Sequence, residues 1–161
     1  MSKQTKTKPD LSLSVQYGVS DTRLPRWRIR RWVDAAIKAA HEDGLITFDR
    51  VSLGVRLVGQ GEGRKMNSDY RQKDYATNVL TFEYGVDPEG CATGDIVLCL
   101  PVLVREAREQ GKTVLDHAAH LTIHGTLHAL GYDHIKANQA KQMEAIEKNV
   151  LAKMKISDPY A

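Results

Sequence analysis

The chain has 161 residues, of which 42% are hydrophobic and 27% are charged, and its formal net charge is +3. This length and composition are typical of one folded domain and exclude a disordered or fibrous chain. The two cysteines, Cys91 and Cys99, form no CxxC pair, which argues against a disulfide framework. The longest apolar run, residues 96–104, is too short to cross a bilayer. A soluble protein of a reducing compartment is expected.

Positive charge is concentrated at the start of the chain. Residues 1–31 carry a net charge of +6 and the remainder −3. Such a segment can contact a polyanion, although short basic stretches are more often solvated tails and helix faces. We expect residues 1–9 to be a disordered basic N-terminus and residues 10–161 to form a single domain.

The first half of the chain predicts two strands separated by a helix. Apolar and polar residues alternate at 11–16 and at 51–57, which is typical of strands with one buried face. Between them, residues 26–43 have apolar side chains at helical spacing, and Gly44 supplies the stop. A polar, glycine-containing segment then predicts a short helix that ends near Arg71 and is followed by a loop.

The second half predicts two paired strands and then three helices. Residues 78–84 and 95–100 are rich in β-branched and aromatic side chains, and a turn with Gly, Pro and Asp separates them. Helical spacing returns at 101–110, 115–130 and 138–153. Strands early and helices late indicate an α+β fold, with a single mixed sheet of about four strands covered by helices.

The segment HGTLHALGYDH, residues 124–134, carries the most specific chemical pattern. On a helix, His124 and His128 lie one turn apart on the same face and can direct two imidazoles at one ion. Gly131 can take the left-handed conformation that ends a helix, which would bring in His134 as a third ligand. Three imidazoles suit Zn²⁺ or another first-row divalent ion and leave one position open, as in catalytic sites. The pattern predicts a zincin-like metal helix that binds one ion per chain.

Two further histidines share the face of this predicted helix. At about 100° per residue, His117 and His120 fall with the first two ligands inside an arc of about 80°. We interpret His120 as a residue that supports the ligands without binding the ion. No role is assigned to His117.

The histidine spacing also matches the HExxHxxGxxH signature of one group of metalloproteases. In those enzymes the glutamate is the general base, and Gly125 stands in its place here. Peptide cleavage is therefore disfavoured, and residues 10–161 are predicted to be a metal-dependent hydrolase of another class.

Three segments together resemble the bacterial YbeY endoribonucleases: HGTLHALGYDH, NSDYRQKDYATNVLTF at residues 67–82, and GDIVLC at residues 94–99. The resemblance runs from about Val51 to the C-terminus, with Ala76 where proline is common in the family. It implies a cytoplasmic, metal-dependent endoribonuclease specific for single-stranded RNA. Such an enzyme acts in ribosomal RNA maturation, at the 3′ end of the 16S RNA of the small ribosomal subunit, and in ribosome quality control. The implied partners are RNA rather than DNA, and ribosomal proteins or an assembly GTPase, with no membrane.

Carried across by position, the resemblance implies that His124, His128 and His134 bind the metal and that Arg71 acts in catalysis. A guanidinium can donate two hydrogen bonds to the phosphodiester oxygens that gain negative charge during cleavage. Four residues of the same motif are weaker candidates for contacting RNA or supporting the loop: Asn67, Tyr70, Lys73 and Asn78.

Three functional hypotheses remain open at the level of sequence. The favoured one is metal-assisted cleavage of RNA, in which either water or the RNA 2′-hydroxyl attacks the phosphate. The second is a ribosome-assembly binding factor whose metal organises the fold, because Gly125 leaves no carboxylate base. The third, which Gly125 disfavours, is hydrolysis of a peptide or small molecule.

Overall fold

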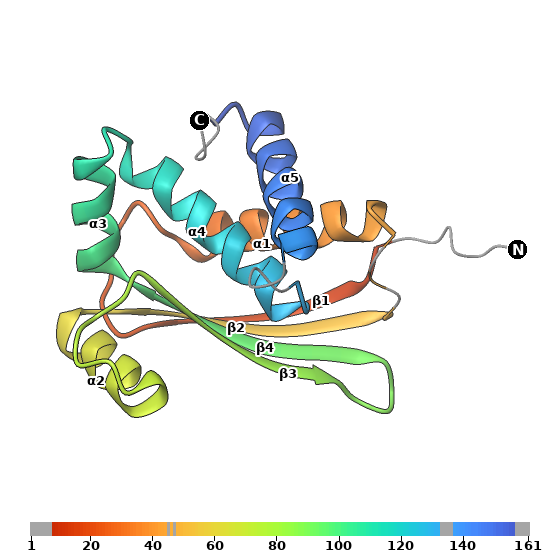
Figure 1. Cartoon of the computed structure of the whole chain (residues 1–161), viewed down its shortest axis with the longest axis horizontal. Coiled ribbons are helices and arrows are strands. Elements are labelled where there is room, and N and C mark those ends of the chain that lie inside the picture. Colours follow the sequence, from red (N-terminus) through yellow and green to blue (C-terminus); the bar gives the residue numbers. More distant parts are fainter. Residues whose placement is uncertain (1–7, 45, 47, 133–136, 157–161) are drawn as a thin grey trace, which may run out of the picture.

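The computed structural model describes residues 8–44, 46, 48–132 and 137–156. In this part of the chain, one four-stranded sheet is combined with five helices (Figure 1). The predicted α+β class and the order of strands and helices are confirmed; most of the predicted N-terminal tail lies outside the described residues. The elements are β1 Asp10–Tyr17, α1 Arg26–Glu42, β2 Arg50–Val58, α2 Gln60–Arg71, β3 Val79–Val86, β4 Cys91–Cys99, α3 Leu100–Glu109, α4 Val114–Ala129 and α5 Ala137–Lys153.

The sheet is mixed, as predicted. Its strand order is β1-β2-β4-β3; β1, β2 and β4 run parallel, and β3 runs antiparallel to β4. Helices α1, α3, α4 and α5 cover one face, whereas α2 lies on the other (Figure 1). The helix-covered face explains the alternating pattern from which β2 was predicted. Leu53, Val55 and Leu57 point to this face and are buried in the main core. No helix of the described part is both long and apolar enough to span a bilayer.

Helix α4 is central to this arrangement. It packs against β3, β4, α1, α3 and α5, and most of its side chains are buried. Its core-facing hydroxyls are satisfied within the helix, since Thr122 and Thr126 each donate a 2.7 Å bond to the carbonyl four residues earlier. A helix buried on several sides carries two of the predicted ligands, His124 and His128.

Both ends of α4 are held by local hydrogen bonds. At its start, Oγ1 of Thr113 accepts a 3.1 Å bond from the backbone N–H of Asp116. At its end, Gly131 has φ +109°, and the N–H of Tyr132 donates to the carbonyl of Leu127 at 3.2 Å. This is a Schellman-type end, which needs a positive φ and therefore favours glycine. The chain turns at Gly131 as the sequence predicted.

Removing the N-terminal cap of α4 should destabilise the whole fold, because this helix contacts α1, α3 and α5 as well as two strands of the sheet. Thr113→Ala is expected to lower the free energy of unfolding by about 1 kcal/mol. Urea denaturation of Thr113→Ala beside Thr113→Ser measures this, since serine keeps the hydroxyl. Equal stability of both variants and the wild type would show that the cap has no effect.

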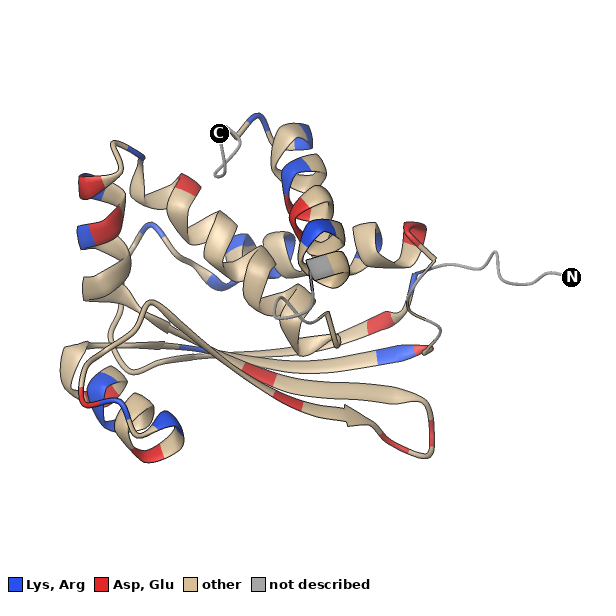
Figure 2. Ribbon diagram, viewed as in Figure 1, with Lys and Arg blue, Asp and Glu red and all other residues tan. Residues whose placement is uncertain are grey.

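Several basic residues near the N-terminus are engaged within the fold. Arg26 and Arg30 of α1 donate to the carbonyls of Val15 and Leu11 on the edge strand β1, at 3.2 and 3.4 Å. Figure 2 shows basic positions along α1, behind α4. Two further cations form ion pairs, Lys8 with Asp34 and Arg23 with Asp21. Part of the charge excess of residues 1–31 therefore has a structural role.

Candidate functional site

The four histidines of α4 form a row along one side of the helix. His117 is buried, and His120, His124 and His128 are each partly exposed. The helix places His124 and His128 one turn apart, as their spacing predicted. His134, the third predicted ligand, lies outside the described residues.

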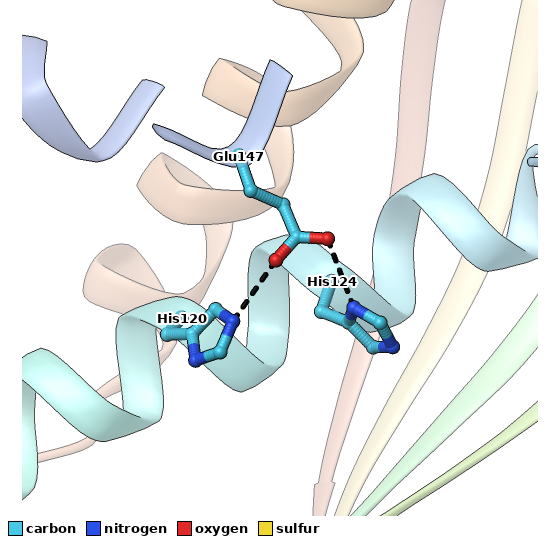
Figure 3. A group of neighbouring side chains, drawn as sticks. All are labelled: His120, His124 and Glu147. Carbon is cyan, nitrogen blue, oxygen red and sulfur yellow. Dashed lines mark hydrogen bonds and ion pairs between the residues drawn. The ribbon is translucent and has the colours of Figure 1, made fainter. Parts of the chain in front are cut away.

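A carboxylate from another helix meets this row. Glu147 of α5 is fully buried, with 0% exposure. Its Oε1 lies 2.9 Å from Nε2 of His120, and its Oε2 lies 2.9 Å from Nδ1 of His124 (Figure 3). One carboxylate therefore bridges two imidazoles that are one helical turn apart.

This group has the chemistry of a metal centre. Ligand atoms of His120, His124 and Glu147 all lie within 4.8 Å of one another, so that the three residues could hold one ion. Imidazole and carboxylate are ordinary ligands of Zn²⁺ and related ions. A buried carboxylate also needs compensating charge and hydrogen bonds, which a cation and two imidazoles would supply.

The atoms involved suggest a second role for Glu147. Metal-binding histidines commonly donate their other ring N–H to a carboxylate, which fixes the tautomer and the orientation of the ring. Here the carboxylate contacts Nδ1 of His124, so that Nε2 is the nitrogen that would face an ion shared with His128. The geometry thus accommodates Glu147 either as a ligand or as the residue that orients His124.

Gly125 faces the sheet rather than this centre. A Cβ atom placed on Gly125 would lie 2.9 Å from Cγ2 of Ile96 and 3.4 Å from Cγ2 of Val79. Ile96 is fully buried, so that it has little room to move. The position that holds the general base in the metalloprotease signature is therefore a packing contact in this chain.

Arg71 lies on the other side of the sheet from α4. It is the last residue of α2, the helix that Figure 1 shows on the face of the sheet opposite α4. Its side chain is exposed and makes no hydrogen bond or ion pair with the described residues. Exposed neighbours flank it: Lys73, and Tyr70, whose ring packs 4.3 Å from that of Phe82. The arginine is accessible to an anion, and no described contact joins it to the histidines.

The two asparagines of the motif hold the loop between α2 and β3. Asn67 is fully buried, and its Nδ2 donates a 2.7 Å bond to the carbonyl of Tyr75. Asn78 donates from Nδ2 to Oε1 of Glu106 at 3.0 Å. Ala76, between these two anchors, packs in a small apolar cluster on the α2 side of the sheet. In this geometry both asparagines support the loop.

Comparison with known proteins places these features in a family. The family model described as Endoribonuclease YbeY matches residues 15–155. The chain belongs to this family. It is 66% identical to Endoribonuclease YbeY of Bordetella avium over 152 residues, which cover 94% of each chain. Its identity to Endoribonuclease YbeY of Burkholderia pseudomallei is 48% over 159 residues, covering 94% of this chain and 81% of the relative.

A solved structure agrees with the fold. The solution structure of TM1509 from Thermotoga maritima has a TM-score of 0.56 and 24% identity, and the match covers 91% of this chain and 97% of that one. At this identity the likeness concerns the fold. Membership of the YbeY family confirms the resemblance drawn from the three sequence segments, and endoribonuclease is the activity for which the relatives are named.

Reasoning from the YbeY motifs missed Glu147 and Glu106. Each is one of many glutamates on amphipathic helices, and each meets its histidine only through packing of separate helices. The one sequence feature that points toward these glutamates is the shared helix face of His117, His120 and His124, because polar side chains on a packed face need polar partners. Neither glutamate could be identified from spacing.

A groove of about 650 Å³ lies on the open face of the sheet, away from the histidine row. Its lining includes Arg56, Phe82 and Tyr84, and the hydroxyl of Tyr84 donates a 2.9 Å bond to Asp95. The histidines and Glu147 take no part in it. The candidate metal centre of α4 and α5 is therefore separate from this groove.

Proposed function

We propose that this chain is a metal-dependent endoribonuclease that cleaves single-stranded RNA in the cytoplasm, in maturation of the 3′ end of 16S ribosomal RNA and in ribosome quality control. The observation that carries the proposal is the bridge between buried Glu147 and the histidines of α4, in a chain of the YbeY family. Ribosomal proteins or an assembly GTPase are the proposed protein partners.

The proposed metal ligands are His124, His128 and His134, with Zn²⁺ as the ion. Imidazoles one turn apart on a buried helix form a rigid pair, and Glu147 fixes the ring of His124. When bound, Zn²⁺ would supply Lewis-acid chemistry toward phosphodiester oxygens. His120 shares the carboxylate and so supports the orientation of the same group.

Arg71 is proposed to bind the phosphate and to stabilise the charge that develops on its non-bridging oxygens. Its exposed guanidinium is available for this role, and a planar fork of N–H groups matches two phosphate oxygens. Lys73 adds a point charge beside it, and the exposed ring of Tyr70 offers a surface on which a base can stack. Asn67 and Asn78 keep the loop in place.

Arg71→Ala should lower kcat for cleavage of ribosomal RNA by about 100-fold, because one donor to the transition state is lost. Zinc content should not change. The matched control is Lys65→Ala on the same helix, where the exposed ammonium pairs with Asp69 of that helix. Mapping cut ends and their end groups also separates attack by water from attack by the 2′-hydroxyl, which leaves a cyclic phosphate. Undiminished cleavage by Arg71→Ala would refute this role.

A ribosome-assembly binding factor is the second candidate, and the packing of Gly125 favours it. A side chain at that position would begin 2.9 Å from Cγ2 of Ile96, which leaves little space for a carboxylate base. This function predicts that a folded Arg71→Ala strain still matures the 3′ end of 16S RNA. Accumulation of 3′-extended precursor in that strain would reject it in favour of the nuclease.

A further inference from the structure

Three polar side chains from three separate elements meet at the end of the sheet below α3. Asn78 lies just before β3, Glu106 on α3 and His117 in the first turn of α4. Oε1 of Glu106 accepts from Nδ2 of Asn78 at 3.0 Å and lies 2.9 Å from Nε2 of His117. A single oxygen therefore joins the loop that follows Arg71 to the helix that carries the histidine row.

The asparagine is fixed at both its side chain and its backbone. Its Oδ1 accepts from the N–H of Val79 at 2.6 Å, and its backbone carbonyl accepts from the N–H of Cys99 at 2.9 Å. With Nδ2 on Glu106, the amide has partners on both its oxygen and its nitrogen. Any movement of Glu106 would therefore be transmitted to the start of β3.

The histidine is equally constrained. His117 is 3% exposed, and burial lowers its pKa from the usual value, opposed in part by the hydrogen bond to Glu106. Burial therefore favours the neutral ring, and Nε2 is the ring nitrogen that faces the acceptor oxygen of Glu106. Glu106 thus links the α4 core to the polar loop.

The loop has a second anchor near α2. Asn67 holds the carbonyl of Tyr75, and Gln72 reverses the chain after Arg71 with a φ of +57°. Asn67 fixes the middle of the loop relative to α2, whereas Asn78 fixes its end relative to α3 and α4. Of these two anchors, Asn78 is the one that relates the loop to the helix of the histidines.

We propose that Glu106 is a positioning residue for RNA cleavage, which sets the loop of residues 72–78, and with it Arg71, relative to α4. The inference rests on the proposed endoribonuclease function. Glu106 acts through Asn78 and His117 and does not touch RNA or metal. Its role depends on the acceptor oxygen, so that glutamine, which keeps Oε1, should substitute for it.

Hydrogen exchange tests the positioning without any activity assay. Glu106→Ala should raise amide exchange in residues 72–79 by about tenfold, whereas Glu106→Gln should stay close to the wild type. Glu109→Ala, at the exposed end of the same helix, is the matched control. If Glu106→Ala does not fold, Asn78→Ala removes the same contact from the other side. Unchanged amide exchange at residues 72–79 in folded Glu106→Ala and Asn78→Ala would overturn the positioning role, whether or not the wild type cleaves RNA.

A double-mutant cycle tests whether Glu106 acts through Arg71. In the wild-type background, Glu106→Ala should lower kcat about tenfold with little change in KM or zinc content. In the Arg71→Ala background the same change should cost less than about twofold. An equal loss in both backgrounds would overturn the proposal, because it would indicate general destabilisation. Absence of RNA cleavage by the wild type would instead reject the proposed function, and the positioning for that reaction with it.

Discussion

Replacing Glu147 by glutamine should lower the affinity of the chain for Zn²⁺ by about 10- to 100-fold. The carboxylate presents one acceptor oxygen to His120 and another to His124, each at 2.9 Å. An amide has only one acceptor oxygen, and its NH₂ group can only donate. One imidazole would lose the contact that fixes its tautomer and ring orientation. Competition with a chromogenic chelator measures the affinity directly.

The control for this measurement is Glu144→Gln, one turn earlier on α5. It removes a charge from the same helix and should leave zinc affinity unchanged. Thermal unfolding of both apo-proteins separates a loss of affinity from a loss of fold. If Glu147→Gln binds Zn²⁺ as tightly as the wild type, Glu147 neither binds nor orients the metal. A loss well beyond 100-fold would identify Glu147 as a direct ligand.

Gly125→Glu, which restores the metalloprotease signature, should destabilise the fold by at least about 3 kcal/mol and produce no peptidase. The new side chain would start 2.9 Å from Cγ2 of Ile96 and would carry a carboxylate into the interface between α4 and the sheet. Overpacking and burial of an unpaired charge both oppose this. Urea denaturation and a peptide-cleavage panel, with and without chelator, measure the two expectations.

Gly61→Glu provides the matched control, because a Cβ at Gly61 meets nothing within 4 Å and lies in the first turns of α2. There the same substitution should leave stability nearly unchanged, since a helix N-terminus favours acidic side chains. A stable Gly125→Glu protein with chelator-sensitive peptidase activity would revive the peptide hypothesis.

The elements of this fold could be predicted because their patterns are local. Alternation in β2 and helical spacing in α1 reflect one buried face each, and the structure confirms both elements. It also confirms α4, which is buried on several sides. The strand order could not be predicted, because the pairing of β2 with β4 depends on residues some forty positions apart. A local sequence pattern does not indicate which distant strand will pair with it.

The residues of the candidate site likewise include some that local spacing predicts and others that it does not. His124 and His128 are close because one helix turn separates them, which the sequence states directly. Glu147 reaches His120 and His124 from α5, and Glu106 reaches His117 from α3, through helix packing. Their membership of the site depends on tertiary structure, and no spacing rule identifies them. Metal binding by His124, His128 and His134 stays a prediction.

The arginines that lie along β1 have a consequence for how this protein associates. Edge strands invite pairing with other chains through unsatisfied backbone groups. Arg26 and Arg30 already occupy two outward carbonyls of β1, and a bulge between Glu83 and Gly85 interrupts the ladder of β3 at the opposite edge. Neither edge offers a long, regular template for strand addition. Partners are therefore expected to dock on side chains rather than to extend the sheet.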